Sequence, residues 1–226
     1  MSGETPVFLE IDDLLTNDEV NKLRTIAAGA PFVAGRVSNP HNITKNNFQI
    51  DVNSPAYKES SALLQDAFMR NEQFRLFAMP KFLAPPMICK YRPGMAYGRH
   101  SDSAYENVNG RKMRFDVSST VFLGDPDKSL GGELTIHLGS RPIRIKGRPG
   151  SAVVYPSSTI HEVLPLEEGE RLVAITFIES EVRDPVRRGL LYDLNEVYAL
   201  EAETMEWENR IRLQHVHTCL KRMWAE

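Results

Sequence analysis

The sequence predicts a mainly β fold, a double-stranded β-helix (jelly roll) with flanking helices. From about residue 85 to residue 180, short β-type runs are separated by Gly and Pro, which is typical of a jelly roll or sandwich rather than of a βαβ sheet. On both sides of this stretch, apolar residues recur at helical spacing. We therefore expect one main domain over residues 1–180, with N-terminal helices packed on the β core, and a C-terminal helical extension over residues 181–226.

The N-terminal segment predicts one strand and two helices. Alternate residues are apolar over residues 7–11, which indicates a short strand. Thr16 and Glu19 form a capping box in front of the first helix. Ser54-Pro55 supplies an N-cap and a favourable first-turn proline for the second helix. The stretch between the two helices is rich in Gly, Asn and Pro, so we expect a loop there.

Eight strands are predicted in the central region. Each is a short apolar or alternating run that ends at a turn signal. The predicted strands are Met87 to Tyr91, Tyr97 to Asp102, Phe115 to Leu123, Glu133 to Leu138, Arg141 to Lys146, Ala152 to Tyr155, His161 to Leu164 and Arg171 to Ile178.

The C-terminal extension is predicted to contain two helices. Asp184-Pro185 begins the first, and the second runs to Trp224. One stripe of the first helix carries Leu190, Leu191, Leu194, Val197 and Tyr198. These helices are also the candidate contact for a homo-oligomer, and the sequence leaves the oligomeric state open. The basic pair Arg187-Arg188 has acidic neighbours and is expected on a solvated face.

Composition and charge exclude several classes of protein. A net charge of -3 and a pI near 6.1 give no reason to expect a nucleic-acid or membrane partner. The N-terminus has no basic region followed by an apolar stretch, so we expect a cytoplasmic protein. Cys89 and Cys219 are far apart, which argues against a disulfide framework, and Cys89 is expected to be a buried, inert thiol.

The candidate catalytic residues are three metal ligands. His100 and Asp102 are separated by one residue, and alternate side chains of a strand project to the same face. His161 opens a distant predicted strand and would complete a two-histidine, one-carboxylate facial triad. This triad is typical of non-haem Fe(II) oxygenases, because it leaves coordination positions open for a bidentate co-substrate and O₂.

Arg171 is the candidate residue for binding that co-substrate. It follows His161 by ten residues in an apolar alternation, where an arginine needs an anionic partner. The dicarboxylate 2-oxoglutarate supplies one, and a strand-edge salt bridge to a glutamate is the alternative. Tyr91 and Tyr97 flank the turn before the ligand strand, so either hydroxyl could reach a carboxylate.

A His-x-Asp pair alone arises often by chance, and a surface His and Asp without a metal is the alternative interpretation. The other histidines fit a metal site poorly, because they lie in a polar loop, in a structural strand or at helix positions that point apart. We expect these four not to bind metal: His41, His137, His215 and His217.

Several ordered motifs resemble those of one bacterial family. They include KNNFQ, KYRPGMAYGRHSD, FDVSSTVFLGDPDKSLGGELTI, YPSSTIHEV, GERLVAITFIES and LLYDLNEV. Together they resemble the PKHD-type hydroxylases, the PiuC/YbiX-like branch of the prolyl and lysyl hydroxylase superfamily, over nearly the whole chain. Several motifs at consistent spacing are far more specific than any one of them.

The resemblance implies Fe(II) at His100, Asp102 and His161, with the distal carboxylate of 2-oxoglutarate at Arg171. It also implies L-ascorbate as reductant, and a hydroxylation that uses O₂ and releases succinate and CO₂. Because Asp102 is present, hydroxylation is favoured over halogenation. The substrate stays open between a prolyl or lysyl side chain and a small molecule or siderophore. A cupin-like metal protein and an iron-dependent sensor without turnover are the alternative functions.

Overall fold

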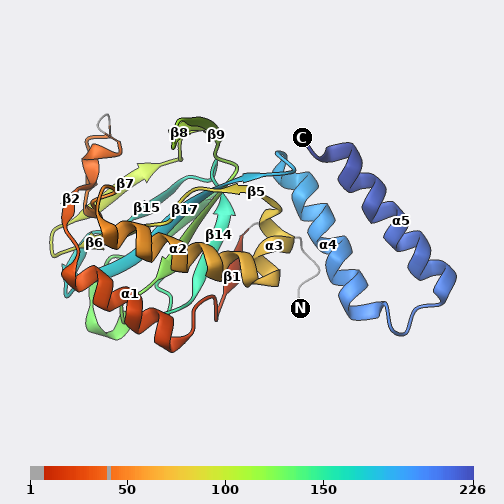
Figure 1. Ribbon diagram of the computed structural model, residues 1–226, viewed down its shortest axis with the longest axis horizontal. Helices are drawn as coiled ribbons and strands as arrows, with labels where there is room; N and C mark the ends of the chain where they lie inside the picture. The colour runs from red at the N-terminus through yellow and green to blue at the C-terminus, as the bar shows by residue number, and fades with distance from the viewer. Residues whose placement is uncertain (1–7, 40–41) are drawn as a thin grey trace.

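Two antiparallel sheets face each other in the computed structural model, which describes residues 8–39 and 42–226 (Figure 1). The larger sheet runs in the order β1 (Leu9–Ile11), β14 (Ala152–Pro156), β10 (Val117–Phe122), β17 (Arg171–Ser180), β6 (Met87–Tyr91), β4 (Phe48–Ile50) and β2 (Phe32–Ala34), with β5 (Pro80–Leu83) also paired to β17. The smaller sheet runs in the order β13 (Arg141–Ile145), β12 (Leu134–Leu138), β15 (His161–Val163), β7 (Ala96–His100) and β3 (Lys45–Asn46).

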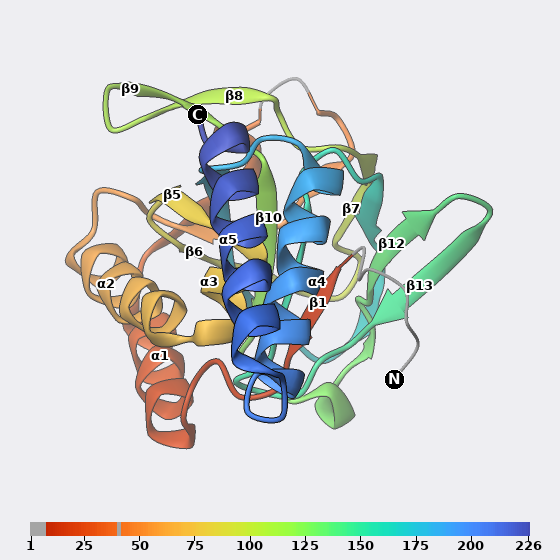
Figure 2. The same ribbon diagram turned by 90° about the vertical axis from the view of Figure 1, so that its right-hand side faces the viewer.

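Two two-stranded sheets extend this framework. The strands β8 (Tyr105–Val108) and β9 (Arg111–Arg114) pair with each other, as do β11 (Leu130–Gly131) and β16 (Leu166–Glu168). Figure 2 shows the β8–β9 hairpin at one rim of the barrel and the β12–β13 hairpin reaching outward from the body.

The larger sheet separates two hydrophobic cores. One face packs on the helices α1 (Asn17–Gly29), α2 (Pro55–Arg70) and α3 (Glu72–Ala78). The opposite face turns into the space between the sheets, and strand alternation assigns the residues to one face or the other. The residues on the inner face include Cys89, Tyr91, Phe122, Val153, Tyr155 and Val173.

The helices begin where the sequence predicts. Thr16 caps α1, and its hydroxyl and the Glu19 carboxylate form both bonds of the capping box. Ser54 caps α2 with Pro55 in the first turn. Both helices bury an apolar stripe against the larger sheet, so that side of the sheet is closed and its other side is left for the site.

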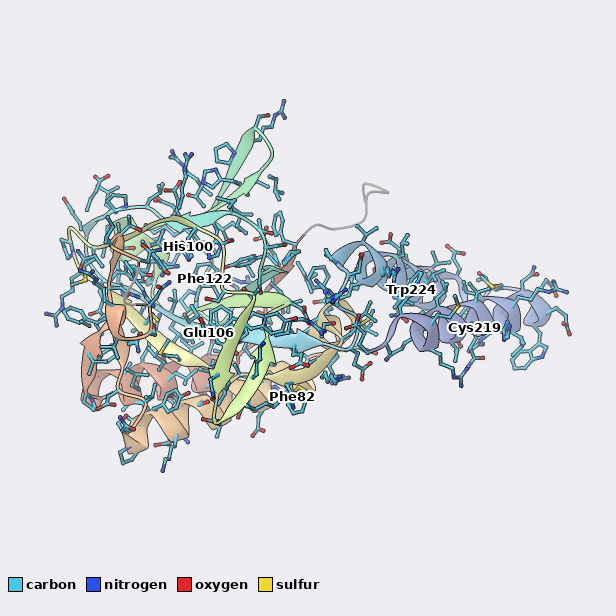
Figure 3. All side chains as sticks on the ribbon, turned by 90° about the horizontal axis from the view of Figure 1, so that it is seen from above. Phe82, His100, Glu106, Phe122, Cys219 and Trp224 are labelled. Atoms are coloured by element: carbon cyan, nitrogen blue, oxygen red, sulfur yellow. The ribbon has the colours of Figure 1, made fainter. Side chains whose placement is uncertain are left out.

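The C-terminal extension consists of α4 (Pro185–Glu201) and α5 (Trp207–Trp224), which lie side by side and project away from the barrel (Figures 1 and 3). Within the predicted stripe, Leu191 is buried but Leu190 and Val197 are exposed. Arg188 is also buried, which contradicts its expected place on a solvated face. Among the described residues, no helix is long and apolar enough to cross a membrane.

The predicted fold class is confirmed: a mainly β, jelly-roll core with helices on both sides in sequence. The predicted loop between the first two helices is wrong, because β2, β3 and β4 lie there and join the edges of both sheets. The strand expected at residues 7–11 is present as Leu9–Ile11, and Val7 lies outside the described residues. The sequence also gave no signal for the β8–β9 hairpin, whose strands are mostly exposed and polar.

Candidate active site

His100, Asp102 and His161 meet at one end of the barrel. His100 ends β7 and His161 begins β15, and the two residues are paired across the smaller sheet. Their Nε2 atoms lie 3.9 Å and 3.8 Å from the carboxylate oxygens of Asp102. One ligand atom from each of the three residues lies within 4.8 Å of the others, and this is the one such triad found among the described residues. The donor set and its spacing therefore fit a single metal ion.

Asp102 lies in the loop after β7, so the expectation that it continues the strand was wrong. Strand pairing stops at His100, because β15 begins at His161 and offers no further partner. The Asp102 amide instead donates to the carbonyl of Ser157 (3.1 Å), and the Ser118 hydroxyl donates to Oδ2 (2.6 Å). The hydroxyls of Ser118 and Ser157 are also bonded to each other, 2.7 Å apart. Residues of the larger sheet thus orient the carboxylate.

Both histidines present the same ring nitrogen to the centre of the triad. The Nδ1–H of His100 donates to the carbonyl of Gly98 (2.8 Å), and that of His161 donates to the carbonyl of Thr159 (3.0 Å). In the neutral ring, each Nε2 therefore carries no proton and has a free lone pair, as a metal ligand requires. Burial lowers the pKa of His100, and the neighbouring His161 lowers it further, which favours the neutral ligand form.

A cavity of about 370 Å³ adjoins the triad. That volume is in the range of small-molecule binding pockets. It opens between the sheets, and residues of β6, β7, β10, β15 and β17 contribute to its wall. In Figure 3 the labelled His100 lies in the barrel, well away from Cys219 and Trp224 in the helical extension.

Arg171 lies in the wall of this cavity on the larger sheet. It begins β17 opposite Tyr91 of β6, and only 8% of its surface is exposed. No carboxylate of the described residues lies within 4.0 Å of its guanidinium, whose nearest aromatic neighbour is the Tyr91 ring at 4.9 Å. Burial lowers the pKa of Arg171. The negative charge of Glu133 opposes this shift from beyond salt-bridge distance. A buried guanidinium with no carboxylate in direct contact indicates an anionic ligand.

Close backbone approach fixes the Arg171 side chain. Gly132 has a positive φ of 73°, and a Cβ atom there would lie 3.3 Å from Cδ of Arg171 and 2.9 Å from Cδ1 of Leu166. A side chain at Gly132 would therefore push into the stem of the arginine as well as straining the backbone. The glycine pair before β12 serves the site in addition to forming a turn.

Two buried tyrosines accompany the arginine. Tyr91 and Tyr155 both line the cavity, and burial raises the pKa of each hydroxyl well above its ordinary value. Both hydroxyls are therefore neutral and can donate hydrogen bonds. Tyr97 stacks on His100, with ring centroids 3.7 Å apart and an interplanar angle of 18°. Its hydroxyl accepts a hydrogen bond from Asn39 (3.2 Å), which holds the ring in its place against His100.

The sequence reasoning missed several residues around the site. Ser118, Ser157 and Tyr155 belong to it through contacts between strands distant in sequence. The signal that could have found Ser118 is the polar run Ser118-Ser119-Thr120 between apolar residues of one strand. Lys45 also lines the cavity and lies in a stretch expected to be a loop.

The remaining histidines and Cys89 have other surroundings. His137 Nε2 lies 2.9 Å from the Glu162 carboxylate on the neighbouring strand. His215 contacts Cys219 one helical turn along α5, and His41 lies outside the described residues. Cys89 is buried as predicted, and burial raises the pKa of its thiol to about 11. The thiol is therefore protonated and unreactive at neutral pH.

Comparison with known proteins assigns the family. The model of the 2OG-Fe(II) oxygenase superfamily matches residues 86–179, which contain the triad and Arg171. A PKHD-type hydroxylase of Sphingopyxis alaskensis is 48% identical over 217 residues, covering 96% of this chain and 99% of that protein. A PKHD-type hydroxylase of Klebsiella pneumoniae is 36% identical, covering 97% of this chain and all of that protein. The chain belongs to the PKHD-type hydroxylases.

Solved structures agree with this assignment at the level of the fold. A Pseudomonas putida prolyl-4-hydroxylase has a TM-score of 0.56 at 21% identity, covering 77% of this chain and 92% of that one. HygX from Streptomyces hygroscopicus, solved with nickel and 2-oxoglutarate, has a TM-score of 0.53 at 15% identity, covering 76% and 82%.

This PKHD-type hydroxylase is thus an Fe(II)- and 2-oxoglutarate-dependent oxidoreductase, and its membership favours that function over a cupin-like binding protein or a sensor without turnover.

Proposed function

We propose that His100, Asp102 and His161 bind Fe(II), and that Arg171 binds the distal carboxylate of 2-oxoglutarate in the adjoining cavity. One observation carries the proposal. A two-histidine, one-carboxylate triad lines the same cavity as a buried arginine on the sheet opposite the histidines, and no carboxylate of the described residues contacts the guanidinium of that arginine. A metal chelator with a second carboxylate at its far end satisfies both features at once.

The side chains of this chain act mainly by binding and orientation. Arg171 fixes the far end of the co-substrate with two parallel N–H donors, and the neutral hydroxyl of Tyr91 is the proposed additional donor. Ser118 donates to the Asp102 carboxylate, and the Ser157 carbonyl accepts from the Asp102 amide, so both hold Asp102 in place. The bound iron and 2-oxoglutarate supply the oxidising chemistry for hydroxylating a C–H bond of the primary substrate, with release of succinate and CO₂.

Succinate formation tests the assignment of the ligands. Protein loaded with Fe(II) is mixed with 2-oxoglutarate and O₂, and succinate is quantified for the wild type, His161→Ala and Asp102→Ala. Both variants are expected to lose bound iron and to release succinate at the background rate. His137→Gln is the matched control, because it retains a hydrogen-bonding group beside Glu162 and removes no proposed ligand. Full succinate release by His161→Ala would refute the assignment.

The primary substrate is proposed only as a prolyl or lysyl type residue or a small molecule. A screen of cell extract for products that gain one oxygen, run with and without the enzyme, identifies it.

L-ascorbate is the proposed reductant, and more turnovers per enzyme in its presence would support this role. A cytoplasmic location, a homo-oligomer through α4 and α5, and the division of domains at residue 180 all stay predictions of the sequence.

A further inference from the structure

Lys45 is a second cation in the wall of the cavity. It lies on β3, at the edge of the smaller sheet, and pairs with Tyr97 of β7. The strand carrying it comes close to β7 because Gly98 has no side chain: a Cβ atom there would lie 2.8 Å from the Thr44 side chain. The edge strand thus brings a lysine next to the strand that carries His100.

The Lys45 ammonium is buried and only partly bonded. Only 6% of the residue is exposed. Nζ donates to the Ser38 hydroxyl (2.6 Å), which donates in turn to Oε1 of Gln49 (2.8 Å). An ammonium has three donors, and the described residues accept from one of them. No carboxylate in the described part of the chain lies within 4.0 Å of Nζ.

The environment of Lys45 connects it with the metal-binding triad. Its Nζ lies 5.4 Å from the centroid of the Tyr97 ring, and the same ring stacks on His100. Burial lowers the pKa of Lys45, while Cys89 and Asp102 oppose that shift. A charged group with two unused donors is costly to hold in a cavity unless a ligand completes its bonds.

We propose that Lys45 binds an anionic group, a carboxylate or a phosphate, of a small-molecule primary substrate. The inference rests on the proposed function, because it assigns the substrate class of the same site. The group must enter a cavity of about 370 Å³ to reach a lysine that is almost fully buried, which favours a small molecule. Bound there, the anionic group lies beside Tyr97, whose ring stacks on His100.

The number of carboxylates on the co-substrate separates this subsite from it. The cavity wall carries two basic side chains, Arg171 and Lys45, and two acidic ones, Asp102 of the triad and Glu106. 2-Oxoglutarate has two carboxylates, of which one binds at the metal and the other at Arg171 under the proposed function. Neither Asp102 nor Glu106 lies within 4.0 Å of the Lys45 ammonium, which therefore has no ion-pair partner among the described residues until a further anion binds.

An anion titration followed by NMR tests the proposal. Protein with isotope-labelled lysine is loaded with Zn(II) and 2-oxoglutarate, and the Lys45 side-chain resonance is assigned by its absence in Lys45→Met. Sodium acetate and inorganic phosphate are the probes, and acetamide is the neutral counterpart of acetate. We expect a saturable shift of the Lys45 resonance with an anion in the millimolar range and none with acetamide. Lys90 is an internal control, because it is paired with Glu170 (3.7 Å) and lies outside the cavity wall.

Three outcomes would overturn the proposal. The first is no shift with either anion, and the second is an equal shift with acetamide, which would remove charge as the cause. The third is a shift seen only without 2-oxoglutarate, which would assign Lys45 to the co-substrate. The same assignment would follow if Lys45→Met weakened 2-oxoglutarate binding tenfold or more while Lys45→Arg restored it. Because zinc supports no turnover, this result is independent of the succinate assay, so the two proposals can fail separately.

Discussion

The barrel and the C-terminal extension bury very different side chains. Between the sheets, charged and polar groups such as Lys45, His161 and Arg171 are almost fully buried. In the extension, α5 has no buried residue, and the buried residues of α4 lie near its start. A buried charge costs stability unless a partner satisfies it. The contrast teaches that the ligands of this enzyme are to be sought between the sheets, whereas the extension affects stability at the point where it is attached.

That attachment is small and mostly apolar. Leu191 packs with Met79 and Val182, and the ring of Tyr192 meets Phe77 edge-on with centroids 5.6 Å apart. Arg188 is the exception, since its guanidinium donates to the carbonyls of Val182 and Arg183. Burial lowers the pKa of Arg188 to about 10, so it remains charged at neutral pH.

The strongest test of the contrast is Arg171→Ala. Removing one partner of a buried, hydrogen-bonded charge pair costs about 2–5 kcal/mol, so the dissociation constant of 2-oxoglutarate is expected to rise roughly 30- to 4,000-fold. Anaerobic titration of the Fe(II) protein with 2-oxoglutarate measures it. Arg171→Lys keeps the charge but loses the planar guanidinium. Its dissociation constant for 2-oxoglutarate should therefore lie between those of the wild type and Arg171→Ala. Unchanged affinity in Arg171→Ala would mean that the arginine is structural.

Leu191→Ala tests the attachment of the extension. Leu191 is fully buried, and truncating a buried leucine costs about 2–5 kcal/mol in the free energy of unfolding, measured by denaturant titration. Leu200→Ala is the control, because Leu200 is 63% exposed on the same helix and should change the free energy by at most about 0.5 kcal/mol. Succinate release well below the unfolding temperature should be the same in both variants. A selective loss of turnover in Leu191→Ala would give the extension a functional role.

Ser118→Ala tests the support of the metal site from the larger sheet. The variant removes the hydroxyl that donates to Asp102, and loss of such a partner is expected to weaken metal binding about 10- to 100-fold. Competition with a metal chelator measures the affinity. Ser119→Ala is the matched control, since its hydroxyl donates to the carbonyl of Val153 and not to a proposed ligand. Equal affinities in the two variants would contradict the role given to Ser118.

Glu19→Gln is expected to have the smallest effect. Arg70 lowers the pKa of Glu19 by a hydrogen bond, so its stabilisation is full above the unfolded pKa near 4.5 and is lost as the pH falls through the lower folded pKa. Glu19 and Arg70 are 22% and 46% exposed, so solvent screening limits the loss at neutral pH to about 0.2–1 kcal/mol.

Unfolding of Glu19→Gln at pH 7 and at pH 3 checks the sign, since the difference from wild type should shrink at the lower pH. Lys22→Gln removes a pair with Glu59 in which both side chains are more than half exposed. It is expected to leave the free energy of unfolding almost unchanged at either pH.

Local signals made much of the fold predictable. The capping box at Thr16, Pro55 in a first helical turn and the alternation of apolar residues in β17 are each set by neighbouring residues. The strands β2 and β3 were missed because their residues are polar or partly exposed and join sheets through partners elsewhere in the chain. Edge strands of this kind carry little periodicity for a sequence to reveal.

The site was predictable in its residue types and less so in its geometry. The spacing of His100 and Asp102 predicted that the two side chains lie together, and they do, but the argument was incomplete because Asp102 lies beyond the strand. Its orientation depends on Ser118 and Ser157, which are distant in sequence. Lys45 could not be found from its neighbours either, since its burial results from the packing of an edge strand.

An ion bound by the triad stabilises the native state by mass action, about 2.7 kcal/mol at a free metal concentration 100 times the dissociation constant. Stripping the ion should therefore speed amide hydrogen exchange first in the short strand β15 and in the Asp102 loop. The helices α1 and α2, on the closed side of the larger sheet, should exchange at their former rate.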